Sequence, residues 1–228
     1  MPKVSMNSQL DVIKNATRIK EEIFAINPNV CIVAATKTVP YDLMTALLDA
    51  GIDVVGENRV NEFQDKYVAG DGFTRHFIGT LQSNKAKHVV GRAALIHSLD
   101  RLTLAREIDR LAGINGTVQD VLVEVNVGME QSKGGVYLSD VENFISEIGQ
   151  FANISVKGLM GVFPILDHVQ TDELHARLAD KFFELKAKNS ANMQYLSAGM
   201  SGDYLTAVKR GANMVRLGTA IFGKREYK

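Results

Sequence analysis

Short apolar runs alternate along the chain with longer segments in which apolar residues recur every three or four positions. The run at residues 31–36 (CIVAAT) is small, branched and apolar, as is typical of a strand buried on both faces. Before it, residues 9–26 place an apolar residue about once per turn between charged ones. This spacing predicts an amphipathic helix with Ser8 as its N-cap.

Eight such apolar runs predict strands, at residues 31–36, 53–57, 76–79, 94–98, 121–126, 156–162, 194–197 and 214–217. Helical patterns separate them, at residues 41–50, 59–68, 83–90, 101–112, 138–151, 171–189 and 204–210. Alternating strands and helices predict parallel strands joined by right-handed crossovers. Eight strands in 228 residues predict a closed (β/α)8 TIM barrel with an additional N-terminal helix. An open, doubly wound sheet is the alternative, and no break in composition divides residues 1–228 into two domains.

Composition indicates a globular protein and disfavours nucleic-acid and membrane binding. The chain is 46% hydrophobic and 23% charged, which suffices for one large core. The 26 basic and 26 acidic residues balance, so there is no electrostatic footprint for nucleic acid or an anionic membrane. Cys31 is the single cysteine, which excludes an intrachain disulfide and fits a reducing compartment. With a polar N-terminus and no membrane-spanning apolar run, we expect a cytoplasmic protein.

A barrel gathers function at the rim where strands lead into the following loops. Lys37 directly follows the first predicted strand, where desolvation beside the core would make its amine a better nucleophile. A lysine that forms a Schiff base with an aldehyde needs this property. On this stretch alone, the more common case is a lysine whose stem covers apolar surface and whose amine reaches solvent.

The last two predicted strands end in similar loops. Residues 196–203 (LSAGMSGD) and 214–220 (MVRLGTA) offer glycines, backbone amides and the hydroxyls of Ser201 and Thr219. Side by side, they predict a phosphate cradle at helix N-termini, although glycines required only by the turns are the alternative. Arg216 is a charged residue in an apolar strand. If it points inward it needs a partner, and if outward it is a surface residue.

Other kinds of site are disfavoured. The five histidines are scattered without metal-ligand spacing, and the predicted strands flank His76 and His97, which favours packed or capping roles. The chain lacks a Walker loop and a dinucleotide fingerprint. The glycine-rich loop at 125–135 is either a lid over the rim or a solvated loop.

Several segments together resemble one family, although each is weak evidence alone. They are residues 35–38 (ATKT), 56–62 (GENRVNE), 76–85 (HFIGTLQSNK), 98–100 (SLD), 130–135 (EQSKGG), 158–160 (GLM), 196–203 (LSAGMSGD) and 215–223 (VRLGTAIFG). Their order and spacing are similar to those of the pyridoxal phosphate homeostasis proteins. These are small single-domain proteins that bind pyridoxal 5′-phosphate (PLP) in a barrel like the N-terminal domain of alanine racemase. The resemblance covers nearly the whole chain.

The resemblance implies a PLP site at the rim of the barrel. Lys37 would hold the cofactor as a Schiff base. Ser201, Gly218 and Thr219 would bind the phosphate together with neighbouring amides.

It also implies roles for three residues around the ring of PLP. Arg216 would face the pyridine nitrogen, Asn58 would lie close to the cofactor, and Met160 would line the pocket. Because arginine cannot accept a proton, it would keep the ring nitrogen unprotonated and weaken the ring as an electron sink. Ala198 departs from the family pattern, which usually has methionine there, and the smaller side chain leaves room beside the loop.

The function that the resemblance implies is a carrier and buffer of PLP. Such a protein would supply PLP-dependent apo-enzymes and maintain vitamin B6 and amino-acid homeostasis, as a monomer without significant catalysis. Alanine racemase has a further C-terminal domain, and its second acid–base group is a tyrosine of the partner subunit. We find no obvious counterpart before Lys228 and expect little racemase turnover. A PLP-dependent amino-acid racemase or related enzyme is one alternative, and a barrel for another phosphorylated metabolite is the other.

Overall fold

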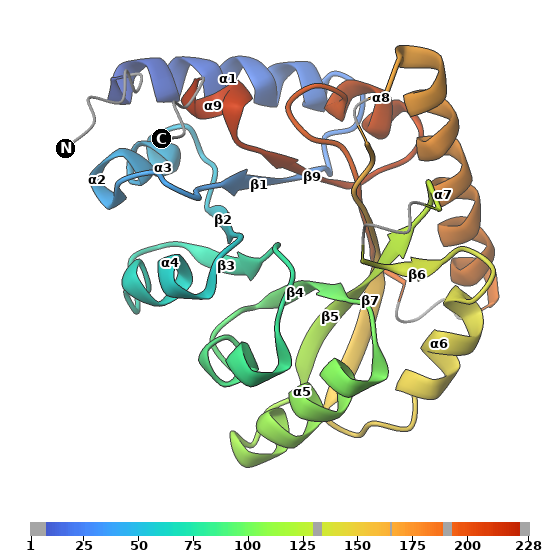
Figure 1. The fold of residues 1–228 in the computed structure, drawn as a ribbon. Coiled ribbons are helices and arrows are strands. Elements are labelled where there is room, and N and C mark those ends of the chain that lie inside the picture. Colours follow the sequence, from blue (N-terminus) through green and yellow to red (C-terminus); the bar gives the residue numbers. More distant parts are fainter. Residues whose placement is uncertain (1–7, 130–133, 165, 189–192, 224–228) are drawn as a thin grey trace.

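The computed structural model describes residues 8–129, 134–164, 166–188 and 193–223. Eight parallel strands form its centre (Figure 1), and they are β1 (Cys31–Ala35), β2 (Val54–Glu57), β3 (Thr74–Phe77), β4 (Leu95–Leu99), β5 (Gln119–Asn126), β7 (Ile154–Gly161), β8 (Tyr195–Ser197) and β9 (Met214–Leu217). They pair in the order β4-β3-β2-β1-β9-β8-β7-β5, and a further pairing of β4 with β5 closes the ring. The predicted (β/α)8 barrel is therefore confirmed, and the open sheet is wrong. A short strand, β6 (Val136–Tyr137), pairs with β5.

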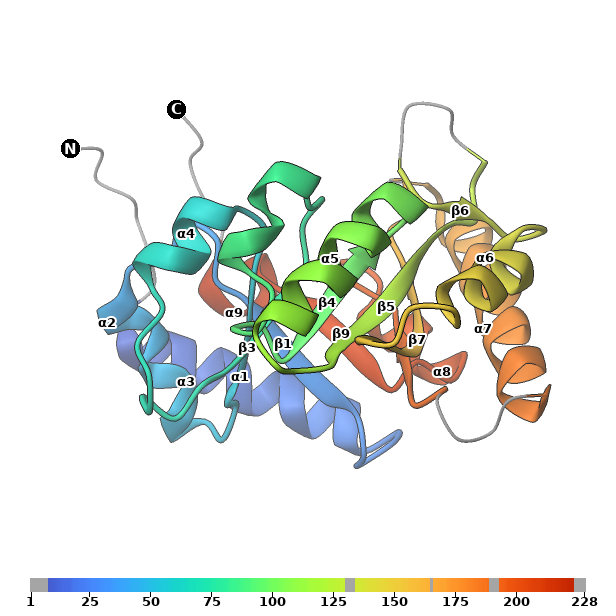
Figure 2. The ribbon, with the colours of Figure 1, turned by 90° about the horizontal axis from the view of Figure 1, so that it is seen from below.

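Helices surround the strands (Figures 1 and 2), and they are α1 (Gln9–Phe24), α2 (Tyr41–Met44), α3 (Ala46–Asp49), α4 (Val60–Asp65), the 3₁₀ helix η1 (Ser83–His88), α5 (Leu102–Ile114), α6 (Val141–Ile148), α7 (His168–Lys188), α8 (Tyr204–Lys209) and α9 (Thr219–Phe222). The additional N-terminal helix is present as α1. The Ser8 hydroxyl accepts a hydrogen bond from the amide of Asp11, whose carboxylate accepts one from the Ser8 amide. This reciprocal capping box fixes the start of α1.

Local boundaries differ from the prediction where a polar residue obscures the pattern. The third strand begins at Thr74 rather than at residue 76, because Arg75 is buried through its ion pair with Asp71. The helix predicted at 41–50 is split at Thr45, whose hydroxyl donates to the carbonyl of Asp42. That bond offers the backbone carbonyl an alternative partner, as threonine often does inside helices. The four-residue helix α9 was not predicted at all.

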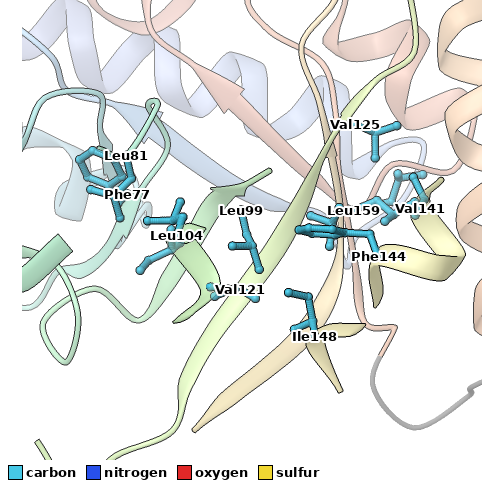
Figure 3. Close-up of a cluster of buried hydrophobic side chains, with 14 of the residues drawn as sticks. Phe77, Leu81, Leu99, Leu104, Val121, Val125, Val141, Phe144, Ile148 and Leu159 are labelled. Carbon is cyan, nitrogen blue, oxygen red and sulfur yellow. The ribbon is translucent and has the colours of Figure 1, made fainter. Parts of the chain in front are cut away.

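Hydrophobic side chains pack in two zones, one between the strands and the helices and one inside the barrel. Figure 3 shows part of the outer zone, where Leu99 and Leu159 of the strands lie near Leu104 of α5 and Phe144 of α6. The inner zone consists of alternate strand positions, and its buried members are Val33, Ala35, Ile78, Leu95, Leu122, Met160 and Met214. This alternation follows the period of two in a strand. Polar residues, among them His76, His97 and Arg216, occupy other positions that face the barrel interior.

In the described part of the chain, no helix combines the length and apolarity needed to cross a membrane.

Candidate functional site

The barrel brings the sequence-predicted residues to one end. Lys37 lies in the turn after β1, and Asn58 directly follows β2. Gly218 directly follows β9, Ser201 lies in the loop after β8, and Met160 is the next-to-last residue of β7. All these strands are parallel, and β1 pairs with both β2 and β9. The five residues therefore meet at the carboxyl ends of the strands, the end at which such barrels carry their sites.

Hydrogen bonds join the last two loops at Ser201. Its Oγ accepts the backbone amides of Gly218, at 3.3 Å, and of Ala220, at 3.0 Å. Because the hydroxyl oxygen accepts in both bonds, its own proton is left as a donor. Thr219 is the first residue of α9 and is exposed. The structure thus brings together the three residues predicted to hold a phosphate.

Asp203 lies in the same loop and fixes its backbone by a hydrogen bond. Its carboxylate accepts the amide of Met200, at 2.6 Å, and contacts Nε2 of the buried His175 at 2.9 Å. Burial alone would raise the pKa of Asp203, but these two hydrogen bonds hold it below its ordinary value. The loop that carries Ser201 is thereby tied to helix α7.

Arg216 points into the barrel and is 5% exposed. Its Nη1 donates to the carbonyl of Ser197 at 2.9 Å and to the hydroxyl of Ser197 at 2.7 Å. Its Nη2 donates to the carbonyl of Gly161 at 2.7 Å. Burial lowers the pKa of Arg216 to about 10, although the negative charges of Glu124 and Asp203 act to raise it. The guanidinium therefore stays charged at neutral pH and joins β9 to β8 and β7.

Two buried histidines continue the hydrogen bonds of Arg216 across the barrel. The Ser197 hydroxyl lies 3.2 Å from Nδ1 of His97, and Nε2 of His97 lies 3.0 Å from Nδ1 of His76. Burial lowers the pKa of His76 to about 4 and that of His97 well below its ordinary value. Both rings are neutral at pH 7. The Ser197 hydroxyl accepts from Arg216, and the tautomer of each ring decides which partner donates in the two histidine contacts.

The sequence predicts packed or capping roles for His76 and His97 and does not connect them with Arg216. Their inward direction could have been predicted from the alternation of side chains along a strand. His76 is two residues before Ile78 and His97 is two residues after Leu95, and both Ile78 and Leu95 line the barrel interior.

Asn58 and Met160 line one cavity at this end of the barrel, with a volume of about 350 Å³. The other lining residues are Ile78, Gly79, Thr80, Glu124, Val125, Asn126, Gly134 and Val162. The volume suits a small ligand or cofactor. Burial raises the pKa of Glu124, and the charge of Asp100 adds to that shift. A larger cavity, of about 690 Å³, lies between α6 and β7 and contains none of the predicted site residues.

Further predictions concern Ala198, Cys31, one loop and metal ligands. Ala198 is buried in the outer hydrophobic zone and does not line the cavity with Asn58. Burial raises the pKa of the Cys31 thiol to about 11, as suits a packed cysteine rather than a nucleophile. Of the loop at 125–135, residues 130–133 lie outside the described residues. Across the described ranges, no histidine, cysteine and carboxylate side chains cluster as metal ligands.

Comparisons with known proteins agree on one group. The family model for the N-terminal domain of alanine racemase matches residues 10–226. A pyridoxal phosphate homeostasis protein of Aquifex aeolicus is 42% identical over 199 residues, which cover 86% of this chain and 87% of that protein. A pyridoxal phosphate homeostasis protein of Escherichia coli is 31% identical over 230 residues, which cover 95% of this chain and 98% of that protein. The solved structure of PipY from Synechococcus elongatus with PLP bound has a TM-score of 0.82 and 28% identity, covering 93% of this chain and all of that chain.

Proposed function

The chain belongs to the alanine racemase N-terminal domain family and, within it, to the pyridoxal phosphate homeostasis proteins, and on this premise we propose that it binds PLP and buffers its supply. The observation that carries the proposal is the geometry of the rim. A lysine, a joined pair of loops with hydroxyl and amide groups, and a buried arginine lie at the end of one barrel. A cavity of about 350 Å³ opens at that end.

The donors present fit the phosphate of PLP. Ser201 accepts two amides and still has its hydroxyl proton to donate, and α9 begins beside it. Small residues and amides at the start of a helix suit a phosphate dianion. We assign Ser201, Gly218 and Thr219 to the phosphate.

Lys37, Asn58, Met160 and Arg216 complete the proposed site. When bound, PLP supplies a reactive aldehyde and an electron-withdrawing ring. We assign Lys37 to the aldehyde, Arg216 to the ring nitrogen, and Asn58 and Met160 to the walls of the pocket. Arg216 donates three hydrogen bonds to Ser197 and Gly161, and its guanidinium has five N–H groups. Because it remains a donor at neutral pH, Arg216 would keep the ring nitrogen unprotonated, which would disfavour catalysis on the ring.

The finer parts of the proposal concern what the protein does with PLP. We propose that it sequesters the aldehyde and releases it to PLP-dependent apo-enzymes, as a cytoplasmic monomer without significant turnover. In support, the relatives from Aquifex aeolicus and Escherichia coli are named homeostasis proteins.

Absorption spectra with added PLP test the proposal directly. The wild type should form a yellow band that borohydride removes, and mass spectrometry should then find the reduced adduct on Lys37. Lys37→Ala should lack the band, because no other amine occupies that position. Lys209→Ala, an exposed lysine at the end of α8, is the matched control and should behave as the wild type.

Two other outcomes would change the conclusion. A colourless wild type that takes up no PLP would favour a different phosphorylated metabolite. Conversion of single-enantiomer amino acids, abolished by Lys37→Ala, would show a racemase rather than a carrier. Optical rotation of the reaction mixture over time distinguishes this last case.

A further inference from the structure

One buried and two half-buried charged side chains contact the turn that carries Lys37. They belong to Glu57 at the end of β2, Glu62 in α4 and Lys66 at the C-cap of α4. Their side chains are 6%, 19% and 14% exposed. Glu57 follows Gly56, which faces the barrel interior beside Val33, so Glu57 faces outward to the helices. None of the three lines the cavity with Asn58 and Met160.

These charges bind both neighbours of Lys37. The hydroxyl of Thr36 donates to Oε1 of Glu57 at 2.6 Å. Nζ of Lys66 donates to the carbonyl of Thr36 at 2.7 Å. The amide of Thr38 donates to Oε2 of Glu62 at 2.5 Å. The backbone of Lys37 is therefore held on each side by a side chain from another element.

Lys66 is the centre of this arrangement. Besides the Thr36 carbonyl, its Nζ contacts Oε1 of Glu57 at 2.9 Å and Oε2 of Glu62 at 3.3 Å. These three contacts match the three protons of an ammonium group. Burial raises the pKa of Glu57, whereas the bond from Thr36 and the charge of Lys66 oppose that rise. Without Lys66, the buried carboxylate of Glu57 would lose its positive partner beside the half-buried carboxylate of Glu62, and the Thr36 carbonyl would lose its donor.

The turn needs such support because of its backbone. Thr38 has φ = 60°, in the left-handed region that β-branched residues rarely adopt. A residue in this conformation persists where surrounding contacts fix it. The bond from the Thr38 amide to Glu62 is such a contact.

We propose that Lys66, together with Glu57 and Glu62, is a positioning residue that fixes the Lys37 turn, so that the Lys37 amine is held ready for the aldehyde of PLP. The inference rests on the proposed function, in which Lys37 bonds that aldehyde. Lys66 itself does not touch the cofactor. It acts through the backbone at Thr36 and Thr38.

The first experiment compares Lys66→Met with the wild type by stopped-flow absorbance after mixing with PLP. Displacement of a reacting group by a fraction of an ångström to one ångström costs about 10- to 100-fold in rate. We expect Lys66→Met to form the yellow band at least about tenfold more slowly. Lys66→Arg, which retains the charge and its donors, should recover part of the rate. The control is Lys188→Met, since Lys188 also bridges two carboxylates, Glu142 and Glu184, but on the surface.

A double-mutant cycle separates positioning from general loss of structure. PLP affinity is measured by equilibrium dialysis for the wild type, Lys66→Met, Lys37→Ala and Lys37→Ala/Lys66→Met. If Lys66 acts through the Lys37 amine, the second substitution has little effect once that amine is gone. Equal loss of affinity in both backgrounds would overturn the proposal, as would formation of the band by Lys66→Met at the wild-type rate.

A second variant covers the case in which Lys66→Met does not fold. Glu62→Ala removes the partner of the Thr38 amide at a partly exposed helix position where alanine is favourable. The same slower formation is expected, and a wild-type rate would count against the proposal. If the wild type itself forms no band, the proposed function fails. If the wild type forms it and both variants match the wild type, this inference fails alone.

Discussion

In the proposed site, Ser201 would serve the phosphate of PLP and not the ring. Its oxygen accepts the amides of Gly218 and Ala220, and its hydroxyl proton is left to donate to a ligand. Lys37 follows β1 and Arg216 lies on β9, whereas Ser201 belongs to the loop after β8. The contributions of phosphate and ring can therefore be separated by mutation.

Substitution of Ser201 by alanine should weaken PLP binding through the phosphate. A hydrogen bond to a charged group contributes about 1.5–3 kcal/mol, which corresponds to roughly 10- to 100-fold in affinity. Pyridoxal, which lacks the phosphate, should bind Ser201→Ala and the wild type equally. Fluorescence titration with both ligands measures the difference. A matching loss for pyridoxal would contradict the assignment of Ser201 to the phosphate.

Prediction at the residue scale succeeded where topology alone decides position. Lys37, Asn58 and Gly218 follow three adjacent parallel strands, so their meeting at one end follows from the alternation of strands and helices. The support around Lys37 was not predicted, because Lys66 binds the carbonyl of Thr36 thirty positions earlier. A charge pattern does not reveal such a partner.

At the scale of elements, β7 has a bulge that a glycine makes possible. The register between β5 and β7 shifts between Val121 and Leu122. Gly158 lies just after the shift with φ = 153°, and a Cβ there would stand 1.8 Å from the carbonyl oxygen of Tyr195 on β8. Bulges bend a strand locally, and glycine permits the close approach of a neighbouring backbone.

Gly158→Ala should therefore destabilise the fold by about 3 kcal/mol, since both the backbone conformation and the contact with β8 would be strained. Urea unfolding without PLP measures the free energy. The control is Gly202→Ala, because a Cβ at Gly202 meets nothing within 4 Å and its stability should change by about 0.5 kcal/mol or less. A Gly158→Ala protein as stable as the control would show that the strands separate at little cost.

Element boundaries were predicted well where apolar residues stand at both ends of a strand. The last strand, β9, has the predicted bounds because Met214 and Leu217 mark its ends, although Arg216 lies within it. The third strand was displaced because its buried Arg75 reads as a surface residue. The helix α9 has only four residues, too few for a helical period to emerge from the sequence.

At the scale of the whole molecule, the barrel interior contains a polar chain that links four strands. Arg216 of β9, Ser197 of β8, His97 of β4 and His76 of β3 are joined by successive hydrogen bonds. Because the pKa of His76 is lowered from 6.5 to about 4 by burial, the unfolded chain binds a proton more readily than the folded one. The contribution of His76 to stability is full above pH 6.5 and is lost as the pH falls toward 4.

This linkage predicts the stability profile in acid. His76 alone should account for about 3 kcal/mol of lost unfolding free energy between pH 7 and pH 4. His76→Asn should therefore lose less stability over that range than the wild type does. His168→Asn, which changes an exposed histidine on α7, should retain the wild-type slope. Urea unfolding at a series of pH values measures the unfolding free energy of the three proteins. Parallel profiles for all three would exclude His76 as the cause of the stability lost in acid.

The pairing of β1 with β9 also dictates the order of events during protein synthesis. Residues 31–35 and 214–217 lie side by side in the ring, although almost the whole chain separates them. On the ribosome, the barrel cannot close until β9 has emerged, and until then β1 and β8 each present an open edge. Such edges are templates for pairing with other chains. The growing polypeptide is thus exposed to mispairing for most of its translation and escapes this hazard only in the final step of assembly.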